Sequence, residues 1–241
     1  MSSAKSVFAK GAIAIAALGF LGAAPAQAGV VVKSSGPSAA SYPVGKKLDD
    51  AASITLQNGD SITVLTDSGT RVISGPGTHR VGARGASKRT AFAMLTRQRS
   101  GARVRTGAVR GGPAGSASNP NLWNVDTGKP GKVCLPGGEA ITFWRPVAEG
   151  DETWVIGSAV SDFHVHVMFA DGEATASLGA EELPLSQNSL YDLSGPAGGP
   201  KQRFEFVTVA GSPDNPEDLA MMLAENGCDS QLELLSEKLA S

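Results

Sequence analysis

The sequence predicts a mainly β protein with two small barrel- or sandwich-like β domains, the second ending in a C-terminal helical hairpin. Three observations lead to this prediction. Thirty Gly and fourteen Pro among 241 residues, with only 5% aromatic residues, favour many turns and short strands. Short apolar segments separated by turn residues recur through 29–86 and 120–209. After residue 215 the apolar residues follow the period of a helix.

Residues 1–28 have the composition of a bacterial-style secretory signal peptide. Two lysines provide a positive start, 11–21 form an apolar run, and 26–28, Ala-Gln-Ala, match a small-x-small cleavage motif. The apolar run is shorter than the ~20 residues that a membrane-spanning helix needs. We therefore expect cleavage after Ala28, export to the periplasm and no transmembrane segment after cleavage.

Residues 29–86 are predicted to form a small basic β domain. Candidate strands lie at 54–56, 62–65 and 71–73, and Val81 is placed on a final strand. Asn58-Gly59 between the first two strands favours a β-hairpin, because both central residues of that turn need positive φ. Asp67-Ser68-Gly69 and Gly75-Pro76-Gly77 supply the later turns.

The run 54–81, ITLQNGDSITVLTDSGTRVISGPGTHRV, resembles the β domain of FecR-type periplasmic proteins. That domain has an apolar pair, Gly-Asp, a strand, a turn containing Gly, and another strand with a closing loop. The resemblance implies a β fold and a periplasmic setting. FecR proteins signal through a membrane-spanning segment, and this chain has no second apolar span, so the resemblance does not extend to that role.

Residues 87–119 are predicted to form an Arg-rich helix and linker. A short helix over 87–98, capped by Ser87, would place Ala91, Met94 and Leu95 on one face. A Gly- and Ser-rich stretch then places the domain boundary near 112–119. The candidate residues for binding an anionic partner are Arg97, Arg99, Arg103, Arg105 and Arg110.

Residues 120–241 are predicted to form an acidic β domain with C-terminal helices. Candidate strands lie at 131–135, 140–145, 153–157, 163–169, 174–178, 189–193 and 203–209. Ala170-Asp171-Gly172 favours a hairpin between the fourth and fifth of these strands.

Two helices follow the last strand of this domain. Asn215 is a candidate cap, Pro216 fits the first helical position and Gly227 fits the position after the helix. A second helix is expected to be capped by Asp229 or Ser230. The apolar faces of the two helices carry Leu219, Met222, Leu223, Leu232, Leu235 and Leu239.

Cys134 and Cys228 are the two cysteines of the chain. Export would place both in an oxidising compartment, which favours a disulfide between them. The bond would close a loop of 95 residues, worth about 4–5 kcal/mol in the chain-entropy model. It would also fasten the corner of the helical hairpin to the preceding sheet.

Charge is distributed unevenly along the chain. Residues 29–115 carry 13 Lys and Arg against 4 Asp and Glu, whereas 116–241 carry 6 against 19. Two interpretations stay open: a basic module for an anionic partner, or attraction between the two halves. Export argues against nucleic acid, and so does the basic stretch 71–110, where Phe92 is the only aromatic residue that could stack on a base. The expected partner is an unknown envelope protein or an anionic envelope component.

Metal and catalytic motifs are sparse. His164 and His166 have a metal-ligand spacing, but the next Glu is Glu173 and the only other histidine is His79, so no metal site and no cofactor are expected. The alternative is a solvent-facing strand edge on which the alternating residues Phe163, Val165 and Val167 are buried. Neither a Gly-x-Ser-x-Gly nor a Gly-x-Gly-x-x-Gly motif occurs, and we do not expect an enzyme.

Trp123, Trp144 and Trp154 are either core anchors of a β domain or a platform that stacks on sugars. The hypothesis from the sequence is therefore an exported, non-catalytic interaction or scaffold protein of the bacterial cell envelope. The alternative is a carbohydrate- or peptidoglycan-binding module.

Overall fold

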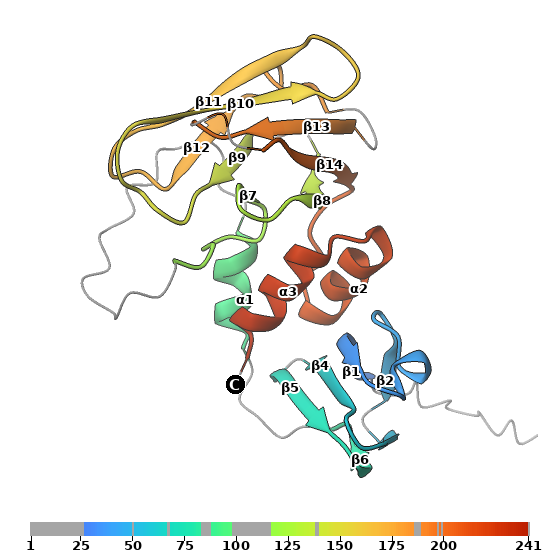
Figure 1. Ribbon diagram of the computed structural model, residues 1–241. Coiled ribbons are helices and arrows are strands. Elements are labelled where there is room, and N and C mark those ends of the chain that lie inside the picture. The colour runs from blue at the N-terminus through green and yellow to red at the C-terminus, as the bar shows by residue number, and fades with distance from the viewer. Residues whose placement is uncertain are drawn as a thin grey trace, which may run out of the picture.

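The computed structural model describes residues 27–49, 51–66, 68–82, 88–97, 117–137, 140–185, 189–196, 198 and 200–240. The protein is mainly β, since 41% of the described residues lie in strands and 18% in helices, and these elements form several sheets and a C-terminal helical pair. The predicted fold class is confirmed. Figure 1 shows the helices lying between two β units.

The first β unit has two layers. An antiparallel four-stranded sheet in the order β2-β1-β4-β5 is built from β1 (Gln27–Ser35), β2 (Lys47–Asp49), β4 (Ser61–Thr66) and β5 (Gly69–Ser74). A two-stranded ribbon of β3 (Ser53–Leu56) and β6 (Gly77–Arg80) forms the second layer. A short 3₁₀ turn, η1 (Ala39–Ser41), lies between β1 and β2.

Both faces of the four-stranded sheet are covered. Val31 and Val64 belong to a core cluster shared with Ile54 of the ribbon. Val30 and Leu65 belong to a different cluster, which contains the C-terminal helices. Consecutive residues of β4 are therefore buried, as expected for a strand that is covered on both faces.

The predicted hairpin at Asn58-Gly59 is wrong. The strand before it, β3, pairs with β6, whereas the strand after it, β4, pairs with β1 and β5. Asp60 gives the physical reason, because its buried carboxylate accepts hydrogen bonds from the backbone N–H groups of Gln57 and Ser38. These bonds tie the turn to the loop after β1, and the chain passes from one layer to the other. Strands β4 and β5, which lie on either side of the other predicted turn, do pair antiparallel.

The second β unit is a sandwich. One sheet has the order β11-β10-β13-β14-β8 and contains β8 (Gly131–Pro136), β10 (Glu152–Ser158), β11 (His164–Phe169), β13 (Ser189–Ser194) and β14 (Gln202–Val209). The other has the order β12-β9-β7 and contains β7 (Val125–Asp126), β9 (Ile141–Trp144) and β12 (Thr175–Leu178). Phe143, Ile156, Phe204 and Phe206 lie in one core cluster that draws on both sheets.

The predicted hairpin at 170–172 is also wrong. The turn itself is present, since Glu173 N–H donates to the Ala170 carbonyl and Gly172 has φ of 76°. However, β12 pairs with β9 of the opposite sheet and not with β11. The turn therefore carries the chain across the sandwich.

The C-terminal helices are α2 (Pro216–Asn226) and α3 (Asp229–Lys238). Asn215 caps α2 as predicted, because its side chain accepts a hydrogen bond from Asp218 N–H. Gly227 ends α2 in the left-handed region with φ of 71°, a conformation that favours glycine. Cys228, one residue earlier than predicted, occupies the N-cap position of α3.

These helices form a core with both β units. Val30 and Leu65 of the first unit, Val207 of the second and Leu223 of α2 belong to one buried cluster. Near the C-terminus, Leu239 O accepts a hydrogen bond from Thr70 N–H of β5. The helical layer thus packs between the four-stranded sheet and the five-stranded sheet (Figure 1).

Helix α1 (Arg89–Thr96) lies within the predicted 87–98 segment and joins the same core. Its buried residues are Phe92 and Leu95, whereas Met94 is 64% exposed, so the predicted Met94 face is wrong. The predicted cap, Ser87, lies outside the described residues. Within the described segments, no helix is long and apolar enough to cross a bilayer.

Candidate functional site

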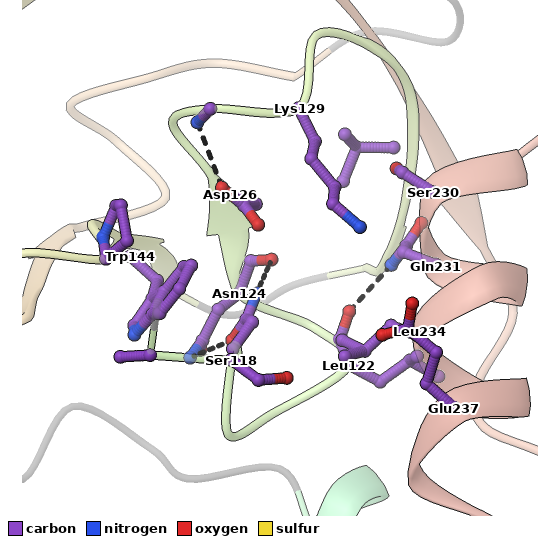
Figure 2. Close-up of a pocket in the computed structure, with 15 residues that line it drawn as sticks. Ser118, Leu122, Asn124, Asp126, Lys129, Trp144, Ser230, Gln231, Leu234 and Glu237 are labelled. Atoms are coloured by element: carbon purple, nitrogen blue, oxygen red, sulfur yellow. Dashed lines mark hydrogen bonds between the residues drawn. The ribbon is translucent and has the colours of Figure 1, made fainter. Parts of the chain in front are cut away.

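A pocket of about 370 Å³ lies where the sandwich meets helix α3. It is lined by the segment 117–129, by Val133 of β8, by Trp144 at the end of β9 with the nearby Pro146, and by α3. In Figure 2, Trp144 and the α3 residues Gln231, Leu234 and Glu237 lie on opposite sides of the pocket. The pocket therefore depends on the junction between sandwich and helices.

Two asparagines shape one wall of the pocket. The Asn119 side-chain amide donates to the Asn124 carbonyl at 3.2 Å, and the Asn124 amide donates to Asn119 Oδ1 at 3.2 Å. Asn119 Oδ1 also accepts from Asn121 N–H. These hydrogen bonds join the asparagines to one another and to the backbone between them. Their main role is therefore to hold the 119–124 loop in place.

Asp126 and Lys129 supply charge to the pocket. Asp126 Oδ1 accepts a hydrogen bond from Gly128 N–H at 2.9 Å. Burial raises the pKa of Asp126, and the Gly128 hydrogen bond and the nearby Lys129 only partly oppose that rise. Lys129 Nζ lies 3.2 Å from Glu233 Oε2 of α3. The half-buried carboxyl lines the pocket, where it can accept hydrogen bonds from a ligand.

Gln231 fixes α3 beneath the pocket. Its side chain is buried, accepts from Cys134 N–H at 2.7 Å, and donates to the carbonyls of Cys134 and Leu122 at 2.8 and 2.9 Å. Three buried backbone groups thus gain partners from one side chain. Because Cys134 is also bonded to Cys228, α3 is attached to β8 at two adjacent points.

The predicted disulfide is confirmed. Cys134 of β8 and Cys228 between α2 and α3 are bonded, with a Cα–Cα separation of 5.9 Å and a sequence separation of 94 residues. Both residues are completely buried. The bond fastens the corner of the helical pair to the five-stranded sheet.

The three tryptophans do not form a common platform. Trp123 is 7% exposed and packs in the helical core, and its indole N–H donates to the Thr96 carbonyl. Trp154 packs against the sandwich core and donates to Glu152 Oε2. Trp144 is the member of the trio that lines the pocket, although only 4% of it is exposed.

His164 and His166 lie on the exposed face of β11, which is an edge strand of its sheet. Their ring centroids are 5.8 Å apart. Val167 is buried as expected, Val165 is half-buried and Phe163 is 38% exposed, so the expectation for Phe163 is wrong. In the described part of the chain, no three His, Cys, Asp or Glu residues are grouped so that they could hold a metal ion.

Arg97 is exposed at the C-terminal end of α1, and its backbone carbonyl accepts from the Asn121 side chain. The other four candidate residues for an anionic partner, Arg99, Arg103, Arg105 and Arg110, lie outside the described residues. Sequence reasoning missed Asn119, Asp126 and Gln231, because polar residues in a loop or helix carry no signal of burial until their packing partner is known.

The chain matches no protein-family model, and comparisons with curated proteins and with solved structures find no match either.

Proposed function

We propose that the protein is an exported, non-catalytic interaction protein of the bacterial cell envelope that binds an anionic envelope component through its basic N-terminal half. The observation that carries this proposal is how few ion pairs join the described residues of the two halves. Between described residues, one ion pair links them, Lys47 to Asp218 at 3.9 Å. The remaining described ion pairs lie within 116–241. Among the described cations of the N-terminal half, Lys47 is therefore the one paired with an acidic residue of the other half.

Several cations of the N-terminal half are exposed and available. Lys33, Arg80, Arg89 and Arg97 are exposed and make no ion pair with another described residue. Each Lys or Arg close to an anionic membrane surface contributes about 1 kcal/mol. Even a few such residues, added to the Arg-rich stretch that follows, would give measurable binding that depends strongly on salt.

A carbohydrate-binding role is the second candidate, favoured by the pocket. Sugar sites combine an aromatic surface with several polar groups. Trp144, Asp126, Lys129 and Glu237 bring both to one place. An aromatic ring beside charged and amide side chains is the combination that a sugar-binding site uses, and binding is the role proposed for the pocket.

Co-sedimentation of the purified protein with three materials would test these proposals: vesicles containing phosphatidylglycerol, purified lipopolysaccharide and cell-wall sacculi. The first proposal expects retention on the phosphate-bearing materials, lost at high salt and in a variant with Arg97, Arg99, Arg103, Arg105 and Arg110 changed to Gln. Retention on sacculi that persists at high salt and falls in Trp144→Phe would support the second. Trp123→Phe is the matched control, because Trp123 does not line the pocket. Absence of binding to all three would contradict both.

A further inference from the structure

The exposed face of β11 carries three potential metal ligands in a row. His164, His166 and Met168 are all exposed and alternate with Val165, Val167 and Phe169 along the strand. Successive side chains of a strand point to opposite faces, so residues two apart share a face about 6.7 Å from each other. Met168 is 72% exposed, so its thioether is accessible from solvent.

A hydrogen bond of His164 orients its imidazole ring and leaves one ring nitrogen free to bind a metal. Its Nδ1 lies 3.2 Å from the Asp162 carbonyl oxygen. A carbonyl oxygen can only accept, so Nδ1 carries the proton and, in the neutral ring, Nε2 keeps its lone pair. Metal-binding histidines are commonly oriented in this way by a hydrogen bond from the ring nitrogen that does not bind the metal.

The neighbouring strand leaves room beside His164. Gly157 of β10 is the residue paired with His164, and a Cβ at that position would lie 3.3 Å from the His164 Cβ. On the other side, no described strand is hydrogen-bonded to β11, because it is the first strand of its sheet. Ring centroids 5.8 Å apart can approach each other by small rotations until both ring nitrogens reach a metal at ~2.0 Å.

We propose that His164, His166 and Met168 form a surface copper-binding site on the edge strand β11. Imidazole binds several divalent metals, and among them Cu²⁺ is bound most tightly by a given nitrogen site. A thioether is a soft ligand that favours Cu⁺. The imidazole pair would hold copper in both oxidation states, and Met168 would strengthen the binding of Cu⁺.

Copper competition titrations of the purified chain, produced without a histidine tag, test this proposal. A chromophoric chelator reports Cu²⁺, and a Cu⁺-specific chelator reports Cu⁺ under reducing conditions mild enough to keep the disulfide. We expect one equivalent of copper in each case. His164→Ala and His166→Ala should each weaken Cu²⁺ binding by more than about tenfold, since loss of even an outer-shell partner costs 10–100-fold.

Met168→Leu separates the two oxidation states. It should leave Cu²⁺ binding nearly unchanged and weaken Cu⁺ binding about tenfold, because it removes a soft ligand and keeps the size of the side chain. His79→Gln is the matched control, since His79 lies on β6 of the other β unit. Because the three proposed ligands are exposed, their variants should melt like the wild type.

Three outcomes would overturn the proposal. One is copper binding that survives in the His164→Ala, His166→Ala double variant, and another is equal weakening by His79→Gln. The third is Cu⁺ binding that is unchanged by Met168→Leu, which would remove Met168 from the site.

Discussion

Arg145 stabilises the sandwich at the level of a single residue. Its side chain is 2% exposed and lies against the Phe169 ring. The guanidinium donates to the backbone carbonyls of Glu173, Glu149, Gly150 and Ala170 and lies 3.1 Å from Glu152 Oε2. All five of its N–H donors therefore have an acceptor. The side chain joins the β9–β10 and β11–β12 connections.

Replacing Arg145 with Lys should lower the free energy of unfolding by about 2–3 kcal/mol, because an ammonium lacks the planar fork and has three N–H donors in place of five for these acceptors. Urea denaturation measures this change. Arg203→Lys is the control, since Arg203 bonds Asp192 at the surface and should change stability by less than about 1 kcal/mol. If the two substitutions lowered the free energy of unfolding equally, the hydrogen bonds of Arg145 would contribute no more to stability than a surface ion pair does.

Asp126 is predicted to destabilise the fold at neutral pH. Burial raises its pKa in the folded state, so folding favours the protonated carboxyl. The favourable contribution is present below the pKa of the unfolded state and is lost as pH rises through the folded pKa.

Asp126→Asn should therefore raise the melting temperature at pH 7 and change it little at pH 3, while the side-chain oxygen still accepts from Gly128 N–H. Thermal melts over that pH range make the comparison. A lower melting temperature for the variant at pH 7 would contradict the assigned burial.

At the residue scale, the sequence predicts the disulfide but not the buried polar side chains. The Cys134–Cys228 bond follows from an even cysteine count together with the expected compartment. Arg145 and Asp60 could not be foreseen, because each is buried only by loops that come from distant positions in the chain. Asp60 shows the consequence: the Ser38 hydroxyl and N–H lower its pKa by hydrogen bonding, although Ser38 lies 22 residues away.

At the level of elements, local patterns located the strands well and their partners poorly. The seven strands expected between 131 and 209 lie within about two residues of β8 to β14. The hairpins expected at 58–59 and 170–172 are crossings between layers. A turn sequence specifies backbone dihedral angles, which a hairpin and a crossing can share, so the choice of partner depends on tertiary packing.

The disulfide is the strongest link between helices and sheet, and replacing Cys134 and Cys228 together with Ser should lower the free energy of unfolding by about 4–5 kcal/mol. The wild type, denatured under reducing conditions, should show a similar loss. A change below about 1 kcal/mol would indicate that Gln231, which bonds the backbone of Cys134, is sufficient to hold α3 in place.

At the level of the whole molecule, the helices bring both β units into one core. Leu223 of α2 is completely buried in the cluster that also contains β1, β4, β8 and β14 residues. The sequence suggested separate domains joined by a linker, and the contacts of α2 and α3 with both units make their stabilities interdependent. Local sequence patterns do not reveal this shared core. The pattern of an amphipathic helix shows which of its residues are apolar, but it does not show how many other elements those residues contact.

Leu223→Ala should lower stability by about 2–5 kcal/mol and reduce amide protection in β4 and β14 together. Hydrogen exchange measured on peptides from the two strands tests this coupling. Leu190→Ala is the control, since Leu190 is 39% exposed and should alter neither strand. Loss of protection confined to β14 would show that the β units are independent.

The proposed role in the envelope depends on the basic N-terminal half, and its most direct test is binding to phosphatidylglycerol vesicles over a salt series. The test variant changes Arg80, Arg89 and Arg97 to Gln, and the control removes the same charge from the acidic half with Lys132, Lys201 and Lys238 changed to Gln. We expect the test variant to bind about 100-fold more weakly, from ~1 kcal/mol per cation, and the control to bind like the wild type. Equal weakening of both variants, or affinity that does not change with salt, would contradict the proposed function.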